Sequence, residues 1–294
     1  MKINIELNEG FLPDSITNSV IEIVSSSLNS INTTKDGFII NDRVFLRKQN
    51  NGKITPCVMN SASYISRKFQ SNLAMHDGCY GESKRLDQNI DGLIELDYSG
   101  VSYSLKSERD VVDVSLEYIR RKGLDRKAIN NLFPMFYGMY MERTCFNIPD
   151  VIDTANLFDG EHIDVQYNIG VEFETGNVAS SFRAINKLNG LFQQGEIDGG
   201  CFITSVDKSS SATRIWPVSN RNGSFQELKQ RRYINQISLP LICIGFAPDG
   251  FSEDVGFLSN LGDLYYLNET DTIDDGTRLK LFIDNNGNDF FSAV

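Results

Sequence analysis

One stretch in the second half of the chain constrains the fold most, because apolar strand-like runs there enclose an amphipathic helix. Residues 169–174 have the pattern of a strand, and residues 178–194 place apolar side chains at helical spacings before Gly195, which is suited to end a helix. Further apolar strand-like runs follow at 200–206 and 239–246. A strand, a helix and a strand in succession predict a βαβ unit. We therefore expect an α/β protein with a central mixed β-sheet flanked by helices.

The first half of the chain has weaker patterns. A helix is expected at 14–31, and short strand-like runs at 36–60 are broken by Asn-Asn-Gly, a hairpin signal. Two alternating runs on either side of Ser99-Gly100 predict a second hairpin. Residues 111–144 have helical periodicity, and Pro134 marks a break or a helix start within them.

Net charge and cysteine content limit the possible binding partners and the cellular compartment. The net charge of −11 argues against a nucleic-acid binder, but residues 175–235 hold eight basic and four acidic side chains. That segment is either a basic footprint for a nucleic acid or a solvated surface of mixed charge. No apolar run is long enough to span a membrane, so no membrane partner is expected. Five scattered cysteines and an N-terminus without a signal-peptide pattern favour the cytoplasm.

A group of carboxylates suggests chemistry. Glu172 and Glu174 are two residues apart on the predicted strand, so their side chains point to the same face. A short turn through Tyr167-Asn168 would bring Asp164 back beside Glu172. Three carboxylates at one sheet edge would suit Mg²⁺, which can activate a water for phosphodiester hydrolysis. The alternative is that these are solvent-facing glutamates of an edge strand.

The sequence around this strand resembles a known family. Residues 171–187, Val-Glu-Phe-Glu-Thr-Gly-Asn-Val-Ala-Ser-Ser-Phe-Arg-Ala-Ile-Asn-Lys, are similar to the active-site strand and following helix of BamHI-like type II restriction endonucleases, members of the PD-(D/E)XK nuclease superfamily. The resemblance implies a restriction-endonuclease-like fold in a single endonuclease domain, 1–294. Its catalytic and DNA-recognition core would be 133–255, and a mostly β segment at 60–130 would be an insertion.

The resemblance also implies an activity. A member of this family would act as a homodimer around double-stranded DNA. It would hydrolyse both strands of a palindromic site with Mg²⁺ and leave 5′ overhangs. A cognate DNA methyltransferase in the same host would be its functional partner.

The acidic residues acquire roles through the same resemblance. Asp164 matches the metal-binding aspartate, and Glu172 would share the metal with the backbone carbonyl of Phe173. Glu174 stands where many related nucleases have lysine and would be the general base. Glu142 resembles a fourth acidic residue that helps to hold the metal, although it would also suit a solvated helix position.

Six further residues match DNA-contacting positions of the family. Asn177, Arg183 and Arg221 would reach base edges in the major groove, and an arginine forked onto guanine is the commonest specific contact. Ser180 and Lys187 would contact phosphates, which position the protein without specifying sequence. Asn220 replaces a family aspartate, which leaves the preference at the outer base pair open. For Arg183 the alternative is a surface ion pair.

Two other functions fit parts of this pattern. One is a related metal-dependent nuclease of repair or structure-specific type, and the other is a catalytically inactive DNA-binding protein. A base-reading set of side chains argues against the first, and the intact carboxylates argue against the second. A site-specific endonuclease is therefore the favoured prediction.

Overall fold

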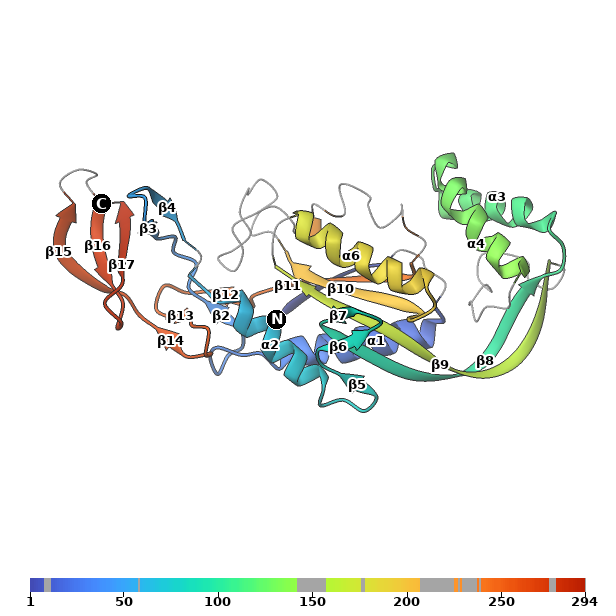
Figure 1. Ribbon diagram of the computed structural model, residues 1–294, viewed down its shortest axis with the longest axis horizontal. Coiled ribbons are helices and arrows are strands. Elements are labelled where there is room, and N and C mark those ends of the chain that lie inside the picture. The colour runs from blue at the N-terminus through green and yellow to red at the C-terminus, as the bar shows by residue number, and fades with distance from the viewer. Residues whose placement is uncertain are drawn as a thin grey trace.

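The computed structural model describes residues 1–7, 12–57, 59–141, 157–175, 178–206, 225–226, 228, 237, 239–274 and 279–293. Within these residues a six-stranded mixed sheet forms the centre of the molecule, with strand order β1-β11-β10-β9-β8-β5 (Figure 1). Its strands are β1 (Lys2–Leu7), β5 (Cys79–Tyr80), β8 (Gly92–Leu105), β9 (Phe158–Glu174), β10 (Gly199–Ser205) and β11 (Leu241–Ala247). The predicted α/β class with a central mixed sheet is confirmed.

The predicted βαβ unit is confirmed at the centre of this sheet. Helix α6 (Val178–Gln193) connects β9 to β10, which run parallel, and β11 continues the parallel set. Gly195 has a φ of +73°, the left-handed conformation that suits the end of a helix. Helix α6 covers one face of the sheet, where its buried side chains pack on β10 and β11: Ala184, Ile185, Leu188 and Leu191.

Two helices from the first half of the chain cover the opposite face. Helix α1 (Asp14–Asn29) is the helix expected at 14–31, and α2 (Ala62–Leu73) begins at a cap formed by Ser61. Alternate residues of β9 point into the core beneath these helices: Tyr167, Ile169, Val171 and Phe173. The intervening even-numbered residues of β9 therefore point to the α6 face.

Strands β8 and β9 form a long antiparallel ribbon whose pairing runs from Gly92↔Val171 to Leu105↔Phe158. The predicted hairpin at Ser99-Gly100 is wrong, because β8 continues through both residues against an equally long partner. Helices α3 (Asp110–Lys122) and α4 (Ile129–Met141) lie at the far end of the ribbon (Figure 1), joined by a 3₁₀ turn, η1 (Arg126–Ala128). The helical periodicity expected at 111–144 is thus confirmed as far as Met141, where this described range ends, with Pro134 inside α4.

A second sheet lies at the opposite end of the molecule (Figure 1), with strand order β15-β16-β17-β3-β4. Its strands are β3 (Leu46–Lys48), β4 (Ile54–Pro56), β15 (Asn268–Asp274), β16 (Leu279–Ile283) and β17 (Asp289–Ala293). The predicted Asn-Asn-Gly hairpin is confirmed between β3 and β4. Short pairs complete the fold: β2 (Ile39–Ile40) with β12 (Gly250–Phe251), β6 (Ser83–Arg85) with β7 (Gln88–Ile90), and β13 (Phe257–Leu258) with β14 (Leu264–Tyr265). None of the described helices is long and apolar enough to cross a bilayer.

Residues 60–130, expected to be a mostly β insertion, contain both helices and strands. They contribute α2 to the core beneath the sheet and β8 to the sheet itself. The segment also contains α3, so its character is mixed.

Gly92 allows β8 to start close to its neighbours. A Cβ atom there would lie 2.5 Å from the Leu73 Cδ2 atom and 3.2 Å from the Tyr80 carbonyl oxygen, and Leu73 is fully buried. We predict that Gly92→Ala lowers the free energy of unfolding by about 1–3 kcal/mol through overpacking. The measurement is urea unfolding. Gly138→Ala in α4 is the matched control, because nothing lies within 4 Å of its Cβ position; equal stability of the two variants would contradict the prediction.

Candidate active site

Glu172 and Glu174 lie at the carboxyl end of β9, where β9 and β10 run parallel. Between them, Phe173 points to the opposite face and stacks with Phe69 at 5.4 Å and with Phe246 at 5.2 Å between ring centroids. Both glutamates therefore point to the α6 face, as the alternation of a strand predicts. The carboxyl ends of parallel strands are a common position for ligand sites in α/β proteins.

Glu172 is a buried carboxylate with a cationic neighbour. Its residue exposure is only 5%. Lys187 on α6 forms an ion pair with the Oε1 atom of Glu172 and donates a hydrogen bond of 2.6 Å to the carbonyl oxygen of Asn89. Helix α6 thus brings an ammonium group onto the carboxylate at the end of β9.

Asp91 is a member of this site that the sequence analysis missed. It lies immediately before β8, and its Oδ2 atom accepts a hydrogen bond of 2.9 Å from the backbone N–H of Phe173. Its Oδ1 atom accepts one of 3.0 Å from the side chain of Gln70 on α2. Asp91 is thereby held beside the end of β9. The available signal was an aspartate preceding Gly92 at the start of an apolar strand.

The carboxylates influence one another electrostatically. Burial raises the pKa of Glu172 to about 7, the Lys187 ammonium opposes that shift, and the negative charges of Asp91 and Glu174 add to it. Burial also raises the pKa of Asp91, while the hydrogen bond from Phe173 and the charge of Lys187 lower it. Carboxylates crowded in this way favour a cation among them.

Asp164 does not join this site. The predicted turn through Tyr167-Asn168 is wrong, because residues 158–174 form one continuous strand. Asp164 lies eight residues before Glu172 on that strand, which at the rise of an extended chain is roughly 26 Å. Its side chain is 80% exposed and lies opposite Ser99. Asp164 and Glu172 therefore cannot hold the same ion in this arrangement.

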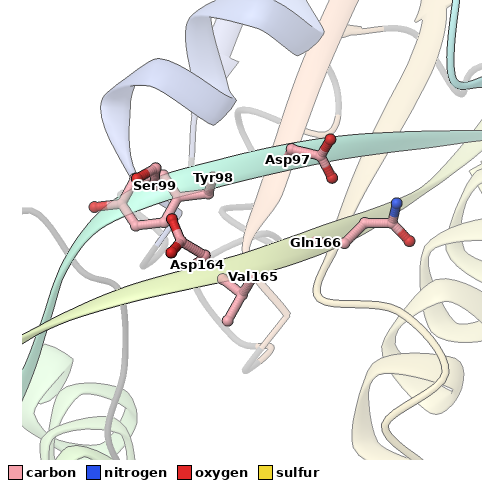
Figure 2. A pocket seen from close by; sticks show the side chains of 6 residues that line it. All are labelled: Asp97, Tyr98, Ser99, Asp164, Val165 and Gln166. Carbon is pink, nitrogen blue, oxygen red and sulfur yellow. The ribbon is translucent and has the colours of Figure 1, made fainter.

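Asp164 instead lines a pocket on the β8–β9 ribbon (Figure 2) with Asp97, Tyr98, Ser99, Val165 and Gln166. His162 lies next to it, 3.3 Å from the Ser99 hydroxyl and 4.0 Å from the Asp164 carboxylate. Both distances are measured from the same Nε2 atom. A catalytic triad uses the two ring nitrogens separately, so this trio lacks that geometry.

The predicted DNA-contacting residues that the structure describes lie on α6. Ser180 is half-buried, Arg183 is exposed, and Lys187 is half-buried against Glu172. Their spacing of three and four residues places them along one face of the helix. Four predicted site residues lie outside the described residues: Glu142, Asn177, Asn220 and Arg221.

The donor atoms of the site fit a hard divalent cation. Asp91 and Glu172 supply carboxylate oxygens, and the buried Oε1 atom of Glu172 already contacts a cation, the Lys187 ammonium. The N–H and C=O groups of one strand residue point to the same side, so the Phe173 carbonyl is expected on the side of β9 where its N–H donates to Asp91. Oxygen donors of these kinds are what Mg²⁺ prefers. No three acidic, histidine or cysteine side chains of the described residues converge closely enough to hold an ion as they stand.

Comparison with known proteins identifies related sequences. A family model described as "Restriction endonuclease BamHI" matches residues 1–260. The "Type II restriction enzyme BamHI" of Bacillus amyloliquefaciens is 28% identical over 95 residues. That alignment covers 32% of this chain and 42% of the Bacillus protein, so the chain matches about two fifths of the length of this relative. The family match includes residues 60–130, the segment that had been expected to be an insertion.

The raised pKa of Glu172 predicts a pH-dependent stability. The folded protein binds this proton more tightly than the unfolded chain, whose pKa is near 4.5. The stabilisation is thus complete below pH 4.5 and is lost as the pH rises through about 7. Relative to Glu172→Gln, the wild-type protein should lose about 3 kcal/mol across this window. The measurement is urea unfolding with a chelator between pH 4 and pH 8; parallel curves for the two proteins would refute the assignment.

Proposed function

The chain belongs to the BamHI family of restriction endonucleases, and on that premise we propose that it is a site-specific type II enzyme that cuts both strands of duplex DNA with Mg²⁺. The observation that carries this proposal is the buried Glu172 carboxylate, flanked by Asp91 and Glu174 at the carboxyl end of β9. The family model extends over the strands and helices that build this site, which supports the same conclusion.

In the proposed site, Asp91, Glu172 and the carbonyl of Phe173 would hold the metal. Asp91 takes the part that the sequence had suggested for Asp164. A bound magnesium ion would supply Lewis-acid polarisation of a phosphate oxygen and charge stabilisation at the leaving oxygen. Two hydrogen bonds orient the Asp91 carboxylate, one from the backbone of Phe173 and one from Gln70. Oriented ligands of this kind keep their geometry when the ion binds.

Glu174 is the proposed general base. It lies on the same face as Glu172 and is more exposed, so a water molecule can reach it. The neighbouring face of α6 would contact DNA, with Ser180 on phosphate and Arg183 on a base edge.

The proposal also covers the oligomeric state, the recognition site and the form of the cut DNA ends. We expect a homodimer, a palindromic recognition site and 5′ overhangs, together with a cytoplasmic location and a cognate methyltransferase in the same host. Asn177, Asn220 and Arg221 remain the proposed base-reading residues, and Glu142 the proposed additional acidic residue. A dimer explains a palindrome physically, because two-fold symmetry in the protein matches two-fold symmetry in the DNA.

Incubation with plasmid DNA and Mg²⁺ tests the activity. A site-specific endonuclease should yield discrete fragments whose sequenced ends share one palindrome and a 5′ overhang. Smearing or nicking would indicate a nuclease without site specificity, and retardation without cleavage would indicate a DNA-binding protein without catalysis. Either of these results would contradict the proposal.

The proposal that Asp91, and not Asp164, is a metal ligand gives a sharper prediction. Asp91→Asn should reduce the cleavage rate at least about 100-fold. Mutation of a residue that only orients a metal ligand typically reduces activity by about 10–100-fold, and loss of a ligand itself should reduce it at least as much. Asp164→Asn should cleave at the wild-type rate, since its exposed carboxylate lies far along β9. The measurement is the single-turnover cleavage rate at saturating enzyme. The reverse pattern would restore Asp164 to the site and exclude Asp91.

A further inference from the structure

Lys187 makes contacts unlike those of the phosphate-binding residue that the sequence suggested. Its ammonium group turns from α6 toward the end of β9, where it contacts Glu172 and donates to the Asn89 carbonyl oxygen. Only 27% of its side chain is exposed. The neighbouring residues Ala184 and Leu188 are buried against the sheet, which fixes the direction in which this part of α6 faces.

This ammonium also acts on a second carboxylate of the site. The charge of Lys187 favours the ionised form of Asp91 as well as that of Glu172. Buried carboxylates that lie close together are costly to ionise without a compensating positive charge. Lys187 therefore supplies, from within the chain, the positive charge that this carboxylate group requires.

We propose that Lys187 is a built-in counter-ion that closes the metal site until a divalent cation displaces it from Glu172. This inference rests on the metal site of the proposed function. The two cations compete because both need the Oε1 atom of Glu172, which lies within the site. Lysine suits an exchange of this kind, because its charge is compact and its four-carbon stem can swing away. The displaced ammonium remains beside Arg183 on the same face of α6, where a DNA phosphate can become its next partner.

The direction in which metal affinity changes when Lys187 is removed distinguishes a counter-ion from a residue that only supports the fold. A competing charge weakens metal binding, so its removal should tighten that binding. A lysine that only supports the fold would, when removed, loosen the site and weaken binding. The affinity for the metal alone, without DNA, therefore reports directly on the competition.

The experiment measures Mn²⁺ binding to the full-length protein by electron paramagnetic resonance of the free ion, at pH 8.5, where carboxylates are ionised. Mn²⁺ is the probe because it shares the oxygen preference of Mg²⁺. Lys187→Met should bind Mn²⁺ at least about tenfold more tightly than wild type, since a unit positive charge near the ion is removed. Lys84→Met is the matched control. It removes the same charge from an exposed lysine that pairs with Asp87, and its affinity should equal that of wild type.

Thermal unfolding provides the second measurement. Lys187→Met should melt at a lower temperature than wild type in chelator, and saturating Mn²⁺ should raise its melting temperature more than it raises that of wild type. If Lys187→Met does not fold, Lys187→Gln replaces it, because the amide keeps a hydrogen-bond donor without the charge. The same tightening is expected.

The outcomes separate the two proposals. Mn²⁺ binding to wild type with unchanged or weaker binding to the Lys187 variants would overturn the counter-ion role and leave the metal site standing. Binding to the Lys187 variants alone would support the counter-ion role strongly. If neither wild type nor the variants bind Mn²⁺, both proposals are overturned. If Lys84→Met also binds Mn²⁺ more tightly than wild type, the effect is one of overall charge, and the counter-ion role of Lys187 is overturned.

Discussion

The candidate site of this protein depends on one buried carboxylate, Glu172, at the end of β9. Glu172 is almost fully buried, and Asp91 and Glu174 add negative charge beside it. Such a group is stable only if other parts of the chain supply donors and positive charge. The backbone of Phe173 and the side chain of Gln70 satisfy Asp91, and Lys187 neutralises Glu172. Strands β8 and β9 and helices α2 and α6 must all be in place for the site to exist.

The long β8–β9 ribbon decides which aspartate belongs to the site. Ser99-Gly100 and Tyr167-Asn168 have local turn character, yet they lie in continuous strands that pair with each other. Pairing along the whole ribbon satisfies the backbone hydrogen-bond groups of both segments, and this outweighs local turn preference. The same continuity carries Asp164 away from Glu172 and brings Asp91, at the start of β8, beside Phe173.

Local patterns predicted local structure well. The helices α1 and α6, the strands around 169–174, 200–206 and 241–247, and the shared face of Glu172 and Glu174 followed from periodicity. The meeting of Asp91 with Glu172 could not follow from it, because a whole helical arm, α3 and α4, lies between them in the chain. Spacing along a sequence identifies residues on one strand but not the partner strand. Lys187 was likewise found as a basic residue on α6, while its carboxylate partner became visible only in three dimensions.

The site is therefore a product of topology rather than of a contiguous motif. Asp91 precedes β8, Glu172 and Glu174 end β9, and Lys187 lies on the helix that follows β9. Asp164 lies on the same strand as Glu172, and eight residues of extended backbone keep the two carboxylates apart. Strand pairing, by contrast, brings Asp91 at the start of β8 beside the end of β9. This geometry favours Asp91 over Asp164 independently of family resemblance.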